Sequence, residues 1–243
     1  MSEAWEAELR IAVIPARGGS KRIPRKNIRS FAGRPMIAWS IERALDSGLF
    51  DRVVVSTDDD EIAAVATAEG AEAPFRRPFE LSDDHTPTKP VVAHAIRTVE
   101  ALVGEAVDYV CCIYPTAPFL AAADLVEAWG AISGGQFRYA FAATSYPYPV
   151  QRALRRLPSG GVEMLSPKYR ASRSQDLEEA WHDAGQFYFG DAAAFIEELP
   201  VFESHSFPVI LPRWRVHDID TPEDWTRAEL MFQALSSVHS TAS

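Results

Sequence analysis

Two groups of charged residues in this chain have the types and the spacing that phosphate chemistry needs. The first follows an apolar run at residues 11–14 and reads Pro-Ala-Arg-Gly-Gly-Ser-Lys-Arg-Ile-Pro-Arg-Lys-Asn over residues 15–27. Between Arg17 and Arg34 the chain places seven of its 24 basic residues and none of its 34 acidic residues. Glycines let a backbone approach a ligand closely, and successive N–H groups in such a turn can point at an anion. The pattern predicts a loop that binds a small, highly charged anion such as a triphosphate.

The alternative is that residues 15–27 form a solvated basic turn. A buried strand that leads directly into Arg-Gly-Gly-Ser-Lys argues against that alternative. The spacings of the P-loop and of the dinucleotide fingerprint are both absent. The whole chain has a net charge of −10 and a pI near 5.1, so the cationic loop belongs to an acidic protein. This balance favours a small anion over a nucleic acid as the ligand.

The second group is Asp218 and Asp220, within residues 216–225. Side chains two apart on an extended segment point the same way, so the two carboxylates share a face. They can also be helix-start acids, but Thr221 already suits the cap, and Asp218 lies too far upstream. Two carboxylates beside a triphosphate loop suit Mg²⁺, which takes one or two carboxylates plus substrate phosphates. His217 is either a base or a structural residue, and it stays outside the predicted catalytic set.

These groups depend on the elements that position them. Apolar runs predict buried strands at residues 11–14, 53–57, 108–114 and 139–144, and helical spacing predicts helices at 35–48, 61–69, 92–102 and 124–132. This alternation predicts an α/β fold with a doubly wound, mostly parallel sheet. Ligands of such sheets bind beyond the carboxyl ends of the strands. Asp58, Asp59 and Asp60 follow one such end; we expect Asp59 and Asp60 to cap the next helix and leave the role of Asp58 open.

The strand–helix rhythm changes at residues 147–183, which are rich in Pro, Gly, Arg and Ser and contain a possible strand at 162–165. The segment is longer than ordinary loops, so we expect it to be functional or an interface. A strand at 185–190, a helix at 192–199, a strand at 207–211 and a last helix follow. We expect residues 1–243 to form a single domain that carries 147–183 as an insertion.

Cysteine content and hydropathy bear on location. Cys111 and Cys112 are adjacent within an apolar run, so we expect reduced, structural thiols. No apolar run is long enough for a membrane helix, and residues 1–10 show no signal-peptide core. These observations predict a cytoplasmic protein with neither a membrane nor a nucleic-acid partner.

The string Ile-Pro-Ala-Arg-Gly-Gly-Ser-Lys at residues 14–21 closely resembles the signature of the acylneuraminate cytidylyltransferase family. The likeness runs from Ile11 to about Leu235. It implies transfer of CMP from CTP to the anomeric hydroxyl of a nonulosonic acid, with release of pyrophosphate. It also implies a Rossmann-like domain, a homodimer joined through an inserted segment that corresponds to residues 147–183, and Mg²⁺ on Asp218 and Asp220.

The resemblance also implies roles for individual residues. In the family the loop cations and serine bind the triphosphate, an asparagine lies near the ribose or base, and an arginine lies near cytosine. The corresponding nucleotide-binding residues are Ala16, Arg17, Gly18, Ser20, Lys26, Asn27 and Arg77. The catalytic set is Arg17, Lys21, Lys26, Asp218 and Asp220. The expected residues for the sugar acid are Tyr114, Thr116, Gln151, Arg170, Arg173, Gln186 and Tyr188, with Lys168 a weaker candidate.

The chain departs from the usual sialate-activating pattern in the expected sugar pocket. Tyr114 and Ala117 stand where glutamine and serine are usual, and Gln186-Phe187 stands for Ala-Ile. An arginine upstream is replaced by His182 or its neighbours. The strings Cys-Cys-Ile-Tyr-Pro-Thr-Ala-Pro-Phe and Trp-His-Asp-Ala-Gly-Gln-Phe-Tyr-Phe resemble the pseudaminate branch of the family. Legionaminate, N-acetylneuraminate or Kdo as the acceptor, or a nucleotide-binding module without turnover, remain the alternatives.

Overall fold

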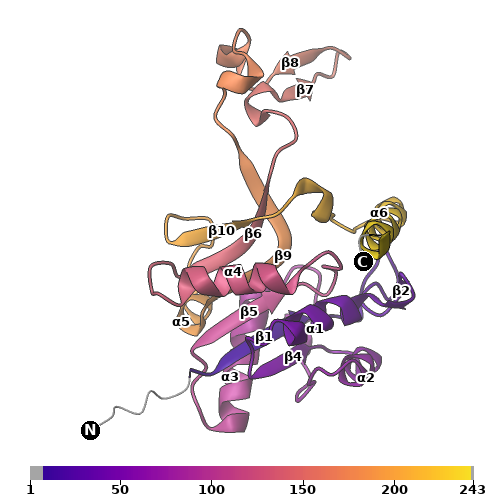
Figure 1. The fold of residues 1–243 in the computed structure, drawn as a ribbon, viewed down its shortest axis with the longest axis vertical. Coiled ribbons are helices and arrows are strands. Elements are labelled where there is room, and N and C mark those ends of the chain that lie inside the picture. The colour runs from indigo at the N-terminus through magenta and orange to yellow at the C-terminus, as the bar shows by residue number, and fades with distance from the viewer. Residues whose placement is uncertain (1–7, 242–243) are drawn as a thin grey trace.

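A six-stranded sheet lies at the centre of the computed structural model, which describes residues 8–241. Figure 1 shows the sheet with its strands in the order β10, β6, β9, β5, β1, β4. The strands are β1 (Arg10–Pro15), β4 (Arg52–Ser56), β5 (Tyr109–Ile113), β6 (Tyr139–Ser145), β9 (Trp181–Asp191) and β10 (Ser206–Ile210). All the predicted buried strands lie in this sheet, and the predicted α/β fold is confirmed.

One strand of the sheet runs against the others. β1 pairs in parallel with β4 and β5, and β10 pairs in parallel with β6, whereas β9 is antiparallel to both β5 and β6. Two neighbouring parallel strands are usually joined by a crossover that contains an α-helix. No α-helix lies in the described stretch between β6 and β9, and β9 pairs with β6 in the antiparallel direction. β9 is longer than the predicted strand at 185–190. It places Gln186 beside the end of β5, where the Gln186 carbonyl accepts the Tyr114 N–H at 2.9 Å.

Helices cover both faces of the sheet, as the predicted doubly wound fold requires. Because successive strand residues point to opposite faces, Ile14 and Val13 of β1 belong to different core clusters. α1, α2 and α4 pack on the Ile14 side, and α3 and α5 pack on the Val13 side. The helices are α1 (Met36–Asp46), α2 (Asp60–Ala68), α3 (Thr88–Val103), α4 (Ala122–Ile132), α5 (Ala192–Ile196) and α6 (Pro222–Thr241). The smaller elements between them are β2 (Ser30–Phe31), β3 (Arg34–Pro35), η1 (Phe79–Leu81) and η5 (Arg213–Arg215).

A third, smaller core joins the last helix to the cationic loop. Ile23 of the loop, Ile219 and Trp225 are all buried in one cluster that includes Phe31, whose ring meets the Trp225 ring edge-on at 5.4 Å. The helix begins with reciprocal bonds: the Asp224 N–H donates to Thr221 Oγ1 at 3.2 Å, and the Thr221 N–H donates to the Asp224 carboxylate at 2.9 Å. The predicted cap is therefore present, and it fixes the segment that carries Asp218 and Asp220.

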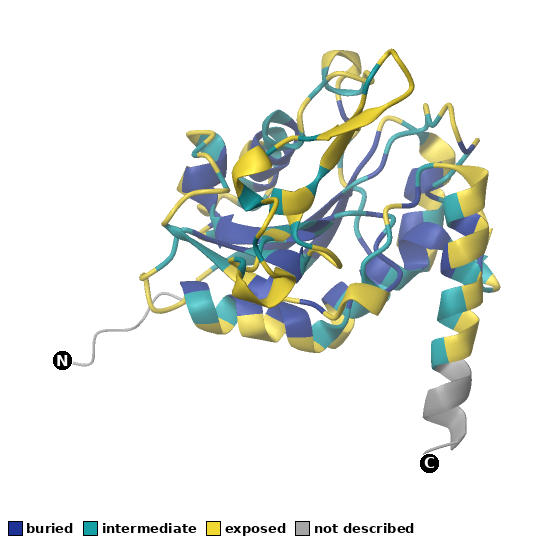
Figure 2. Ribbon diagram, turned by 90° about the horizontal axis from the view of Figure 1, so that it is seen from above, coloured by how far each residue is buried: buried dark blue, intermediate teal, exposed yellow. Residues whose placement is uncertain are grey.

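Residues 146–180, between β6 and β9, rise away from the sheet as an arm (Figure 1). The arm contains a hairpin of β7 (Leu154–Arg156) and β8 (Val162–Met164) and the short turns η2 (Val150–Arg152), η3 (Pro167–Tyr169) and η4 (Ser174–Asp176). Figure 2 shows it mostly exposed. Its exposed apolar side chains include Tyr148, Val150, Leu154, Val162 and Leu165. The predicted excursion at 147–183 corresponds to this arm, whose apolar surface the described chain leaves uncovered.

Cys111 and Cys112 lie fully buried in β5 as free thiols, and burial raises the pKa of both. The prediction of unpaired structural cysteines is confirmed. Among residues 8–241, no helix has the length and apolar character needed to span a bilayer. The first seven residues, which formed most of the region tested for a signal-peptide core, lie outside the described part of the chain.

Candidate active site

The candidate site lies where parallel strands end at one edge of the sheet. The cationic loop follows β1, Asp58 follows β4, and Tyr114 follows β5. The carboxyl ends of these strands meet because β1 pairs in parallel with both neighbours. This is the edge at which open α/β sheets bind ligands.

A cleft of about 360 Å³ opens over the cationic loop. Its volume lies within the range of small-molecule sites. The cleft brings together six residues of the predicted catalytic and nucleotide-binding sets with two others. The predicted residues are Arg17, Ser20, Lys21, Lys26, Asn27 and Asp220, and the additional ones are Arg22 and Asp84.

The backbone of the loop is held from within. Ala16 is fully buried, and its N–H donates to the Ser56 carbonyl at 3.0 Å. Asn27 is also buried, and its Nδ2 donates to the Arg17 carbonyl at 3.0 Å. Gly18 is needed for a close approach, because a Cβ there would lie 2.6 Å from Asp59 Oδ2. These contacts give the loop a defined shape without a ligand.

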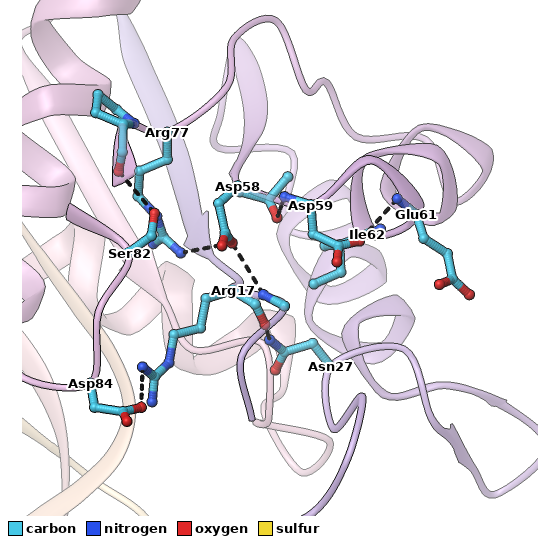
Figure 3. A network of polar contacts seen from close by, with 12 residues as sticks. Arg17, Asn27, Asp58, Asp59, Glu61, Ile62, Arg77, Ser82 and Asp84 are labelled. Atoms are coloured by element: carbon cyan, nitrogen blue, oxygen red, sulfur yellow. Dashed lines mark hydrogen bonds and ion pairs between the residues drawn. The ribbon is translucent and has the colours of Figure 1, made fainter. Parts of the chain in front are cut away.

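Asp58, whose role the sequence leaves open, links this loop to Arg77 (Figure 3). Its Oδ1 accepts the Gly18 N–H at 3.1 Å and lies 3.8 Å from Arg77 Nη2. The predicted caps are as expected: the Asp59 carboxylate accepts two N–H groups at the start of α2, and Asp60 lies in its first turn.

Arg77 is a buried guanidinium with an unmet donor. Its side chain is 4% exposed, its Nε donates to Ser82 Oγ at 3.2 Å, and its Nη2 has no hydrogen-bond partner in the described chain. Burial lowers the pKa of Arg77, and the negative charge of Asp58 offsets part of this lowering. An unpaired buried donor costs free energy, so this group is suited to a ligand that supplies an acceptor.

Asp218 and Asp220 flank the buried Ile219 on an extended segment, as the sequence predicts. Lys26 Nζ donates to the Ile219 carbonyl at 2.9 Å and lies 3.3 Å from Asp220 Oδ1, and Arg22 pairs with Asp220 at 2.8 Å. Burial, followed by repulsion from Asp220, raises the pKa of Asp218. Two carboxylates in mutual repulsion fit a divalent cation.

In the described part of the chain, no cluster of three or more His, Cys, Asp or Glu residues is suited to hold a metal ion. A cation on these two aspartates would therefore draw its other ligands from substrate and water. His217, which stays outside the predicted catalytic set, has its Nε2 2.9 Å from the Trp214 carbonyl.

The residues predicted to bind the sugar acid fall into two separate groups. Tyr114 and Tyr188 lie together, with ring centroids 5.7 Å apart; Tyr114 Oη lies 3.2 Å from Thr88 Oγ1, and Tyr188 Oη donates to Asp183. Thr116 follows β5 and is half-buried. Gln186 is buried; its Nε2 donates to the Arg215 carbonyl at 2.7 Å, while its Oε1 has no partner in the described chain.

The second group lies on the arm. Gln151, Arg170 and Arg173 all belong to the segment between β6 and β9, and Gln151 Nε2 donates to the Glu178 carbonyl at 2.8 Å within the arm. None of the three lines the cleft over the cationic loop. A single chain therefore does not bring these residues to the loop.

A family model described as Cytidylyltransferase matches residues 11–221 of this chain. The chain belongs to the cytidylyltransferase family. It is therefore an enzyme of cytidylyl transfer, as the resemblance in its sequence implies. Enzymes of this family generally use a divalent metal ion, which agrees with the carboxylate pair beside the loop.

Individual members of the cytidylyltransferase family show how far the similarity extends. The chain is 48% identical over 223 residues to a pseudaminic acid cytidylyltransferase of Campylobacter jejuni, covering 92% of this chain and 96% of that protein. It is 34% identical over 220 residues to N-acylneuraminate cytidylyltransferase A of Danio rerio, covering 90% of this chain and 49% of that protein. It is 30% identical over 230 residues to a CMP-N,N'-diacetyllegionaminic acid synthase of Legionella pneumophila, covering 92% of this chain and 96% of that protein.

The fold is also that of a solved nucleotidyltransferase. The structure of CMP:2-keto-3-deoxy-manno-octonic acid synthetase complexed with CTP aligns with a TM-score of 0.67 at 20% sequence identity, covering 93% of this chain and 99% of that one. At this identity the alignment supports the predicted Rossmann-like architecture alone.

The fit between Gly18 and Asp59 yields a test within the cytidylyltransferase loop. Gly18→Ala would place a Cβ 2.6 Å from Asp59 Oδ2, the oxygen that pairs with Arg25 Nη1, while Asp59 Oδ1 caps α2, so the loop must shift. We expect CTP binding measured by calorimetry to weaken roughly tenfold, since overpacking costs about 1–3 kcal/mol. Gly19→Ala is the matched control, because a Cβ there meets nothing within 4 Å. Equal affinities for the two variants would contradict the assigned contact.

Proposed function

We propose that this cytidylyltransferase transfers CMP from CTP to the anomeric hydroxyl of pseudaminic acid. The 48% identity to a protein of that name over nearly the whole chain is the observation that supports the acceptor most directly. The cationic cleft beside two carboxylates supports the nucleotide half of the reaction. CMP-legionaminate, CMP-N-acetylneuraminate and CMP-Kdo synthesis are the alternatives within the same chemistry.

In the proposed reaction the sugar hydroxyl attacks the α-phosphorus of CTP. A new oxygen–phosphorus bond forms, the bond to the β-phosphate breaks, and the hydroxyl proton passes to solvent or a base while pyrophosphate leaves. Such a reaction requires positioning and charge stabilisation above all. Arg17, Ser20, Lys21 and Lys26 line the cleft and would hold the leaving phosphates.

The cytosine half of the nucleotide is assigned to Arg77. Cytosine carries acceptor atoms on its pairing edge, and Arg77 has a buried Nη2 without a partner in the described chain. Asp58 bridges Arg77 and the Gly18 N–H, so the base-reading residue and the phosphate loop share one support.

The metal ion is assigned as Mg²⁺ on Asp218 and Asp220. Mg²⁺ would supply charge neutralisation of the phosphates and make an adjacent hydroxyl easier to ionise. The chain's own contribution is to hold both carboxylates beside the loop, through the buried Ile219 and the Lys26 contacts.

The acceptor test compares substrates. Tyr114, Thr116, Tyr188 and the unpartnered Gln186 Oε1 present polar groups to the proposed acid, in place of those of sialate enzymes. A site with buried polar groups rejects acids that leave them unpaired. Pyrophosphate release should therefore give a kcat/KM for pseudaminic acid at least roughly 100-fold above that for N-acetylneuraminate. A higher kcat/KM for another acid would make that acid the acceptor in place of pseudaminic acid. If no acid gave pyrophosphate release, a nucleotide-binding module without turnover would be favoured.

The metal assignment is tested against the helix-start alternative. Asp218→Asn should lower turnover by roughly 100-fold or more without lowering the melting temperature, because the charge of Asp218 is disfavoured in the folded chain. Asp224→Asn is the control: it weakens the cap, so the melting temperature should fall by about 2–4 °C while turnover persists. Full activity of Asp218→Asn in Mg²⁺ would contradict the assignment.

We also propose that the enzyme is a homodimer, in which the arm supplies Arg170 and Arg173 for the acceptor carboxylate of the other subunit. The arm exposes apolar side chains that a second copy would cover, and its arginines lie away from the cleft of their own chain.

The buried free thiols agree with the expected cytoplasmic location.

The arm is tested by mass and by complementation. Light scattering should give about twice the chain mass of 26.9 kDa.

Arg173→Ala should raise the acceptor KM roughly 10- to 100-fold, as expected for a charged hydrogen bond, and leave the CTP KM unchanged. Arg155→Ala is the control, since Arg155 pairs with Glu163 inside the hairpin. Co-expressed Arg173→Ala and Asp220→Asn chains should recover about a quarter of wild-type activity if the arm acts across a two-fold interface. No recovery would place the arm's action within its own chain.

A further inference from the structure

A carboxylate that is not among the predicted site residues faces the cationic loop. Asp84 belongs to the segment 82–87 between η1 and α3, and it lines the same cleft as the loop. Its Oδ1 lies 2.5 Å from Arg17 Nη1, and its Oδ2 lies 2.5 Å from Lys21 Nζ. One carboxylate thus bridges two of the cations to which the proposed function assigns the phosphates.

The segment around Asp84 is folded by its neighbours and not by Asp84 itself. The Asp83 carboxylate accepts the His85 N–H at 3.0 Å and both the N–H and the hydroxyl of Thr86 at 2.7 Å. Ser82 Oγ donates to the Pro78 carbonyl at 2.9 Å. In the described chain, Asp84 forms ion pairs with the two loop cations. Its carboxylate can therefore leave them without unfolding the turn that carries it.

Carboxylate and phosphate oxygens are alternative anionic partners for the same donors. Hydrogen bonds from Lys21 and then from Arg17 lower the pKa of Asp84, so the side chain is charged at neutral pH. A phosphate bound at the two cations would meet that charge at close range. The pairs are partly or largely exposed, with Lys21 81% exposed, so breaking them is inexpensive.

We propose that Asp84 is a displaceable counter-ion of the triphosphate site: it pairs with Arg17 and Lys21 when the cleft holds no phosphate, and the triphosphate replaces it. The proposal rests on the proposed function, because it takes the cleft as the phosphate site. In the reaction cycle, return of Asp84 to the two cations opposes retention of pyrophosphate. The residue thereby sets the affinity of the site for its leaving group, without contact to the reacting atoms.

The test uses inorganic pyrophosphate as the probe and the full chain in EDTA, so that no metal ion contributes. Asp84→Asn removes the competing charge and keeps the size of the side chain. An exposed ion pair changes an equilibrium constant by a factor of roughly 1.5 to 5, so two pairs predict a Kd for pyrophosphate that is lower by a factor of roughly 2 to 25. Product inhibition by pyrophosphate should strengthen by the same factor.

Asp60→Asn is the matched control. Asp60 carries the same charge, pairs with Arg76 at 2.5 Å on the surface, and does not line the cleft. Its substitution should leave the pyrophosphate Kd within about twofold of wild type. Equal tightening by both variants would show a general effect of net charge and overturn the proposal.

Hydrogen exchange gives a second readout that a merely structural role would not produce. Because Asp83 and Ser82 hold the turn, the amides of residues 82–87 should exchange at the same rate in the wild type and in Asp84→Asn, and faster exchange in the variant would show a structural role and overturn the proposal. Weaker or unchanged binding by Asp84→Asn would overturn the proposal, because Asp84 would then order the cations instead of competing for them. A wild-type chain that binds neither pyrophosphate nor CTP would overturn the proposed function itself.

Discussion

Charge compensation around one loop is the constraint on which the rest of this site depends. Seven cations between residues 17 and 34 repel one another, and no acidic residue lies among them. The fold answers by bringing partners from distant parts of the chain to each cation. Asp84 pairs with Arg17 and Lys21, Asp220 with Arg22 and Lys26, Asp59 with Arg25, and Glu42 and Glu69 with Arg34, while Arg29 lies over the Trp225 ring.

The topology explains why these partners arrive at one place. Parallel pairing of β1 with β4 and β5 brings the segments that follow the strands to the same edge, which delivers Asp58 and Asp59 to the loop. Asp220 comes by another route: the cluster of Ile23, Ile219 and Trp225 fixes the start of α6 against the loop. Apolar packing thus determines the geometry of the charged groups, and the charges need only complete it.

Much of this arrangement could be predicted from residue types and spacing. The alternation of strands and helices and the cap at Thr221 are local properties, and both appear in the structure. Asp84 could not be predicted, because a lone aspartate in a polar loop carries no periodic or motif signal. Its importance comes from where the segment after η1 turns in space. The separation of Arg170 and Arg173 from the cleft was also hidden, since spacing along the sequence does not report the direction of an arm.

The carboxylates around the loop differ in how firmly they are held. Those held by the backbone support the loop, and those held only by side chains can be displaced by a ligand. Asp59 receives Arg25 and two backbone N–H groups of α2, which together lower its pKa to about 2. Removing it would also uncap a helix, so it is part of the framework. Among the described residues, Asp84 receives two side-chain cations and no backbone donor. A phosphate can replace the second kind of contact but not the first. An acidic protein can therefore keep its cationic loop folded without a ligand and still open part of it to one.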